Sequence, residues 1–207
     1  MEVGLPVMLI LTLYFSFYLE IDYYWNNALE ASKIQLSETD GYYPYYNYNL
    51  SDLGTVWKLL YTILFISMLS LLSSHKIKSK ALGIVAICSG LLIVLAFLSI
   101  GLYTLSELRE NFLSPELSKN FEISIYNIYI RYIGFGFFAF LLFAIRTLVR
   151  QDFMKINYKV PFEIVMHTSI IWILSSELLN WMDLSGSEQS YKLGLSILWG
   201  LYALLLI

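Results

Sequence analysis

The chain has 207 residues and a formal net charge of −3, and 58% of its residues are hydrophobic while only 14% are charged. A soluble domain usually carries about 25% charged residues and could not bury this much apolar surface in one core. The composition therefore predicts an integral membrane protein in contact with the lipid bilayer, and it excludes a basic surface for nucleic acid. The single cysteine, Cys88, excludes an intrachain disulfide and a cysteine-based zinc site.

Six apolar stretches approach the length of about 20 residues that a helix needs to cross a bilayer core. The sequence therefore predicts an all-α integral membrane protein, a single membrane domain whose six transmembrane helices form three antiparallel hairpins. We expect no cofactor. The predicted helices are residues 3–21, 56–74, 81–105, 123–148, 162–182 and 191–207.

The distribution of lysine and arginine predicts the orientation in the membrane, because cytoplasmic loops carry an excess of these residues. Two loops, between the second and third and between the fourth and fifth helices, are rich in them, so we expect these loops and the N-terminus to be cytoplasmic. The last stretch is still apolar at Ile207, so either the C-terminus lies at the membrane face or the chain is a fragment. We favour a fragment, whose partners would include further helices of a longer parent chain. The cations of the two loops are Lys76, Lys78, Lys80, Arg146, Arg150, Lys155 and Lys159.

The one sizeable polar segment is the predicted outer loop, residues 22–55, which contains a cluster of tyrosines between Tyr42 and Tyr48. Such a cluster could stack on sugar rings, or it could form an aromatic belt at the headgroup layer, where Tyr and Trp are enriched. The tripeptide Asn49-Leu-Ser51 matches a glycosylation sequon, which is a frequent chance match.

The first, third and fifth predicted helices end alike, each with a glutamate near the outer boundary and an aromatic residue about a turn later. Lys58, Arg131 and Lys192 of the other helices lie at a similar level. If this short repeat is real, it brings acids and bases of several helices to one depth. Chance and the aromatic belt are the alternative explanation. The three glutamates are Glu20, Glu107 and Glu177.

Arg131 lies about two turns inside the fourth predicted helix, where an unpaired arginine would cost about 2.5–3.5 kcal/mol at the bilayer centre. Glu177 of the fifth helix lies at a similar depth and is its predicted partner. The pair could be a buried packing bridge, or it could belong to a ligand or ion site that opens to the outer side. The candidate polar site consists of Arg131, Glu177, Glu107, Glu20 and Asn127.

Glu163 and His167 are one turn apart near the inner end of the fifth helix. A Glu–His pair can bind a metal or relay a proton, but no third ligand lies nearby in the sequence. We therefore expect a hydrogen-bonded structural pair and no metal site. The sequence contains no P-loop, no Gly-x-Ser-x-Gly and no His-Glu-x-x-His, which argues against an enzyme.

A recognisable pattern is found in Ile171-Trp-Ile-Leu-Ser-Ser-Glu-Leu-Leu-Asn-Trp181, in the segment from Tyr191 to Tyr202, in Gly101–Arg109 and in Ile130-Arg131-Tyr132. These segments carry a resemblance to a family of large bacterial membrane proteins, the domain of unknown function two-three-three-nine, in its Bacteroidetes-type members. It covers most of the chain after about Val56. It implies a location in the bacterial inner (cytoplasmic) membrane and a fragment of a longer protein, and it transfers no catalytic residues.

Three hypotheses follow for the function. The first is a multi-pass envelope protein that binds or translocates a polar or lipid-linked ligand at the candidate polar site. The second is a structural or assembly module whose buried ion pairs hold the hairpins together. The third is an envelope enzyme that acts on a lipid or glycan, which would need a base and a nucleophile within reach of each other.

Overall fold

The computed structural model describes residues 4–35, 44–114, 119–154, 158–187 and 190–206, with the backbone alone for residues 4–6. Some residues named above lie outside this part of the chain. They are Val3, Tyr42, Tyr43, Lys155 and Ile207.

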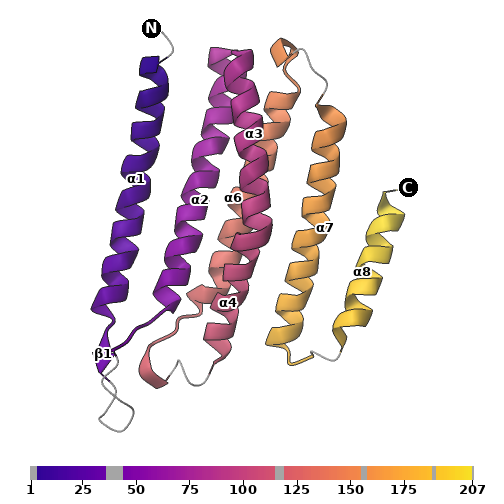
Figure 1. Cartoon of the computed structure of the whole chain (residues 1–207). Coiled ribbons are helices and arrows are strands. Elements are labelled where there is room, and N and C mark those ends of the chain that lie inside the picture. The colour runs from indigo at the N-terminus through magenta and orange to yellow at the C-terminus, as the bar shows by residue number, and fades with distance from the viewer. Residues whose placement is uncertain (1–3, 36–43, 115–118, 155–157, 188–189, 207) are drawn as a thin grey trace.

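The described chain is almost entirely helical, and the prediction of six helices is confirmed. The third helix is one continuous rod in which α3 passes through a π-helical segment, η2, into α4 (Figure 1). Five of the six are long and apolar enough to cross a membrane, whereas α8, with 15 residues, is shorter. The bounds are α1 Gly4–Ala31, α2 Asn49–Leu72, η1 Ser73–Ile77, α3 Lys80–Ala96, η2 Phe97–Gly101, α4 Leu102–Leu113, α6 Tyr126–Val149, α7 Lys159–Leu184 and α8 Tyr191–Leu205.

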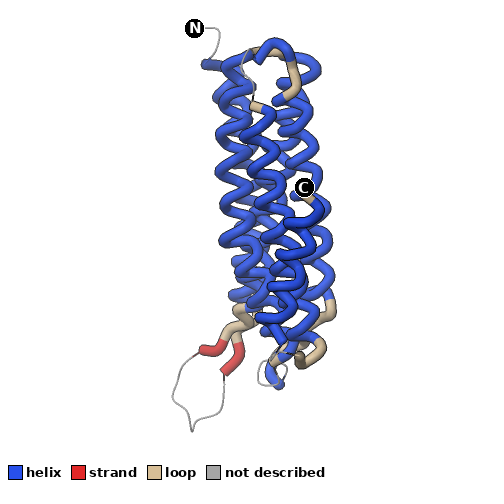
Figure 2. Tube along the Cα trace, turned by 90° about the vertical axis from the view of Figure 1, so that its right-hand side faces the viewer, coloured by secondary structure: helices blue, strands red, loops and turns tan. Residues whose placement is uncertain are grey.

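Two short strands and a 3₁₀ turn complete the described elements. Strands β1 (Ile34–Gln35) and β2 (Pro44–Tyr45) pair antiparallel, with Ile34 opposite Tyr45, and η3 (Asp152–Met154) lies between α6 and α7. The strands lie at one end of the bundle, which we call the Tyr-loop end; the end that carries η1 and η3 is the opposite end (Figures 1 and 2).

Several helices extend beyond the predicted boundaries, so the predicted outer loop is much shorter than residues 22–55. Helix α1 continues to Ala31, α2 begins at Asn49, and the third helix continues to Leu113. A count of apolar residues finds the position at which the apolar stretch ends. The helix can continue past that position, because a helical backbone does not require apolar side chains. Helix α6 begins at Tyr126, later than predicted, and the Ser124 hydroxyl accepts a hydrogen bond from its first N–H.

The helices fall into two groups. Four elements, α2, α3, α4 and α6, pack against one another, and we call them the central helices. Helix α1 packs mainly on α2, α7 lies against α4 and α6, and α8 packs on α7; we call these the peripheral helices. Figure 1 shows the peripheral helices on the two flanks of the central group, and Figure 2 shows that the molecule is narrow when seen along this row.

The core lies between α2, α3, α4 and α6, where the buried residues of each helix recur every three or four positions. Phe97 of η2 and Phe138 of α6 stack with ring centroids 4.6 Å apart. Helix α3 comes close to α6 because Gly90 has no side chain: a Cβ there would lie 2.6 Å from Ile145. Small residues allow such close approach of helices.

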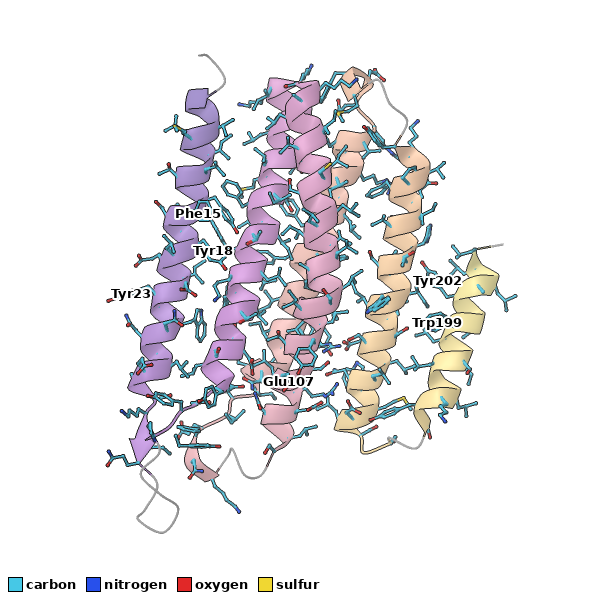
Figure 3. All side chains as sticks on the ribbon, viewed as in Figure 1. Phe15, Tyr18, Tyr23, Glu107, Trp199 and Tyr202 are labelled. Atoms are coloured by element: carbon cyan, nitrogen blue, oxygen red, sulfur yellow. The ribbon has the colours of Figure 1, made fainter. Side chains whose placement is uncertain are left out.

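The peripheral helices leave most of their apolar side chains outside the core. None of the apolar window of α1 is buried, and only 6% of that of α7 is. Figure 3 shows Tyr23 projecting away from the bundle, and Phe15 is 51% exposed. Exposed apolar surface on this scale is unusual for a soluble protein and is compatible with a membrane location.

Candidate functional site

Arg131 and Glu177 form an ion pair between α6 and α7, as the sequence predicted. The Nε of Arg131 donates to a Glu177 carboxylate oxygen at 2.8 Å, and its Nη2 donates to the Ser176 carbonyl at 2.9 Å and to the Ser176 hydroxyl at 2.5 Å. The Tyr132 hydroxyl donates to the second Glu177 oxygen at 2.8 Å. The guanidinium therefore binds both the side chain and the backbone of α7.

The Arg131 side chain is deeply buried in this bridge. It is 1% exposed, while Glu177 is 19% exposed, and the guanidinium carbon lies 5.6 Å from the centre of the Phe135 ring. One nitrogen, Nη1, is buried and has no hydrogen-bond partner among the described residues. Most of the hydrogen-bonding capacity of the arginine is thus used to fasten α7 to α6.

A second ion pair fastens α7 to α4, and the sequence analysis did not predict it. Nη2 of Arg109 lies 2.6 Å from a carboxylate oxygen of Asp183, and both side chains are largely buried. The Tyr191 hydroxyl at the start of α8 also hydrogen-bonds Asp183. The sequence did contain a signal: Leu102, Leu105 and Arg109 are spaced three and four, so Arg109 continues a buried stripe.

Asn127 lies in a layer of amides at the Tyr-loop end and does not contact Arg131 through any described hydrogen bond. Its amide donates to Asn49 at 2.5 Å and to the Leu108 carbonyl at 3.0 Å. Asn111 of α4 donates to Asn49 and to Asp52. Asn49, the first residue of the sequon, is therefore a buried, hydrogen-bonded residue of helix α2.

The remaining predicted members of the polar site lie elsewhere. Glu107 is half-buried on α4, close enough to Asp52 for the two carboxylates to repel each other (Figure 3). Glu20 is exposed and lines a separate open cavity of about 550 Å³ between α1, α2 and α6, together with Trp57 and Tyr126. The structure thus brings Arg131 and Glu177 together and places Asn127, Glu107 and Glu20 in other surroundings.

A third ion pair joins α1 to α2, at 2.7 Å between Lys58 Nζ and Asp22. With it, the ion pairs between helices in the described part of the chain show one pattern. The cations lie on central helices and the carboxylates on peripheral ones. Each pair therefore attaches a peripheral helix to the central group.

At the opposite end, Glu163 and His167 line one cavity on α7. The Nδ1 of His167 lies 2.9 Å from the Tyr202 hydroxyl of α8, so the bond that the structure shows for the imidazole runs between helices. Within the described residues, no group of three His, Cys, Asp or Glu side chains is placed to hold a metal ion.

An open, mostly apolar cavity of about 440 Å³ lies between the third helix, α7 and α8. Three serines, Ser106, Ser175 and Ser176, are among the residues that line it. The Trp199 indole donates to the Ser175 hydroxyl at 2.9 Å, and Figure 3 shows Trp199 and Tyr202 directed toward α7. Among the described residues that line this cavity, only Ser176 hydrogen-bonds to Arg131.

These features define a helical bundle with apolar flanks whose charged groups are organised as bridges between helices. No protein-family model matches the chain, and no curated protein or solved structure gave a match. The proposed function therefore rests on the geometry of the chain itself.

Proposed function

We propose that the chain is a multi-pass membrane protein that serves as a structural module, in which ion pairs fix the peripheral helices against a central group. The observation that carries this proposal is the Arg131 side chain, which is 1% exposed and bound to Glu177 and Ser176 of α7. A ligand-binding arginine needs an accessible face, whereas a bridging arginine is covered on all sides.

The way α7 is attached supports the proposal. Because α7 buries only 6% of its apolar window, apolar packing holds it weakly. Between helices in lipid, apolar contact gives little driving force, so packing and polar contacts must set their positions. The pairs made by Arg109 and Arg131 supply two fixed points near one end of α7.

A mutant cycle on Arg131 and Glu177 tests this proposal. Arg131→Leu should lower the free energy of unfolding in detergent by about 3 kcal/mol, because it leaves Glu177 without its cation. Arg131→Leu combined with Glu177→Leu should recover most of that loss, since an apolar pair can replace a buried bridge. The matched control is Tyr129→Leu, which removes an exposed polar side chain from the same helix.

The same variants can overturn the proposal. If the double variant stays as unstable as Arg131→Leu, the pair does more than bridge two helices. If both single variants are as stable as the parent protein, the charges do not hold the fold together.

A second candidate function is the binding or translocation of a polar or lipid-linked ligand near Arg131. Two observations favour it: the Nη1 of Arg131 lacks a partner among the described residues, and a cavity of about 440 Å³ reaches Ser176. This function is the one to pursue if the single variants leave stability unchanged. The bacterial inner-membrane location, the cytoplasmic N-terminus and the family resemblance stay predictions.

A further inference from the structure

The opposite end of the bundle contains a basic cavity between the last turn of α6 and the first turns of α7. Its volume is about 100 Å³. Arg146 and Arg150 come from α6 and its C-cap, and Lys159 and His167 come from α7. Among the described residues of the lining, Glu163 is the only carboxylate. This cavity, which we call the basic cavity, therefore has an excess of positive charge.

The two arginines of the basic cavity differ from the three cations that form ion pairs between helices nearer the Tyr-loop end. Lys58, Arg109 and Arg131 each face a carboxylate of a peripheral helix. Neither Arg146 nor Arg150 forms an ion pair with any residue that the structure describes, and both are exposed. They are one helical turn apart, so they point to the same side of α6 and can contact one anionic group together.

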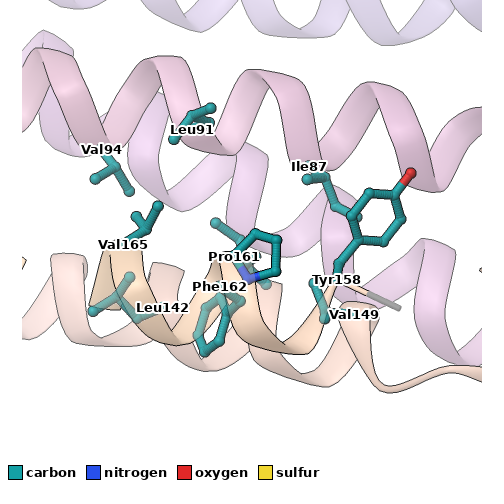
Figure 4. A pocket seen from close by; sticks show the side chains of 10 residues that line it. Ile87, Leu91, Val94, Leu142, Val149, Tyr158, Pro161, Phe162 and Val165 are labelled. Carbon is teal, nitrogen blue, oxygen red and sulfur yellow. The ribbon is translucent and has the colours of Figure 1, made fainter. Parts of the chain in front are cut away.

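An apolar cavity of similar volume, about 100 Å³, adjoins the basic cavity. Val149 and Phe162 line both cavities, so the two lie side by side. Figure 4 shows the walls of the apolar cavity: Leu91 and Val94 belong to α3, and Val165 belongs to α7. From Val149 to Leu142 the cavity follows α6 for about 10 Å, at 1.5 Å per residue.

A charged cavity beside an apolar one matches the two parts of a phospholipid. We propose that this double cavity binds an anionic phospholipid, with its phosphate against Arg146 and Arg150 and an acyl chain between α3, α6 and α7. Basic pockets between transmembrane helices are suited to anionic headgroups. A free phosphate would occupy the basic cavity alone and would leave the apolar cavity unexplained.

This inference rests on the proposed location in a membrane, but it does not depend on the role of the Arg131 bridge. The bridge fastens α7 at the Tyr-loop end, and the lipid would fill the space between α7 and its neighbours at the opposite end. A bound acyl chain would fill the apolar cavity and would contact the walls that α3 and α7 contribute to it.

The test is lipid binding to the purified full chain, measured by native mass spectrometry and by the shift of the melting temperature. Phosphatidylglycerol should bind and raise the melting temperature, phosphatidylcholine should do so much less, and glycerol phosphate, the soluble headgroup, should have no effect. Replacing both arginines, Arg146→Gln with Arg150→Gln, should weaken phosphatidylglycerol binding about 30-fold, which corresponds to about fivefold for each cation lost.

The matched control is Lys76→Gln with Lys80→Gln, which removes two cations from the same end of the bundle but outside both cavities. This control should weaken binding less than twofold. Equal weakening by the two double variants would show general surface attraction and would overturn the inference. An equal response to glycerol phosphate would show an anion site without a lipid.

The unmodified protein also decides the question if the arginine variant fails to fold. Equal binding of phosphatidylglycerol and phosphatidylcholine to the parent protein would overturn the inference by itself. Failure of the proposed membrane location is recognised separately, because the parent chain would then be helical and monodisperse in buffer without detergent.

Discussion

Helices α6 and α7 are nearly equal in length, yet they are held in the molecule in different ways. Within their most apolar windows, 39% of α6 is buried and only 6% of α7. Helix α6 packs on α2, α3 and α4 through a continuous stripe of apolar residues. Helix α7 buries just Ser169 and Asn180 completely and is tied to the central helices by ion pairs and a few side-chain contacts.

The comparison shows two ways to position a helix when the surroundings are apolar. Apolar side chains can contact lipid as well as protein, so apolar contact alone does not hold a helix in place. Packing can hold α6 because the neighbouring helices approach it closely and match its shape. A helix without such packing needs contacts that lipid cannot replace, such as ion pairs and hydrogen bonds. Substitutions in the two helices should therefore differ in size and in kind.

The largest effect is expected from Phe138→Ala, which removes the ring that stacks on Phe97 in the core. The free energy of unfolding in detergent should fall by about 3–5 kcal/mol, because the surrounding helices cannot close the cavity fully. Trp172→Ala on the exposed face of α7 is the matched control and should change it by about 0.5 kcal/mol or less. Similar losses in both variants would contradict the difference between α6 and α7.

An intermediate effect is expected from Asn127→Ala. The substitution removes the amide that donates to Asn49 and to the Leu108 carbonyl, so buried polar groups lose their partner. Chemical denaturation in detergent should show a loss of about 2 kcal/mol. Asn27→Ala, at an exposed position of α1, is the control. A loss below about 0.5 kcal/mol for Asn127→Ala would show that the amide layer contributes little.

The smallest effect is expected from Asp22→Asn, which weakens the ion pair that joins α1 to α2. The two side chains are partly exposed, so the loss should be about 0.5–1 kcal/mol. Glu20→Gln, two residues earlier on the same helix, serves as the control and should have no measurable effect. If both variants lose the same amount, total charge rather than this contact holds α1 in place.

The sequence predicted the features that depend on length, composition and helical spacing. Six helices follow from six apolar stretches, and the Arg131–Glu177 pair follows from equal depth on two helices joined by a short connection. An arginine inside an apolar helix needs an acidic or polar partner at a similar depth. Few acidic residues lie within the apolar stretches, so there were few candidate partners for Arg131.

The sequence did not predict contacts that depend on how helices are rotated and which ones are neighbours. Glu20 was expected at the same depth as the other glutamates, but it lines a cavity on the α1 side of the bundle. The predicted fifth helix ends at residue 182, one residue before Asp183, whereas α7 includes Asp183 and presents it to Arg109. The polar residues just beyond each apolar stretch belong to the helices, and hydropathy alone does not predict this.

The π-helical segment η2, Phe97–Gly101, has a consequence for any comparison with related chains. It places α3 and α4 in different rotational phases along one rod, because a π turn accommodates an extra residue within a regular helix. Deleting one residue there would turn everything beyond it by about 100° relative to α3. Arg109 would then point away from Asp183 without any change in either residue. In relatives of this protein, the length of the segment should therefore be preserved more strictly than its amino acids.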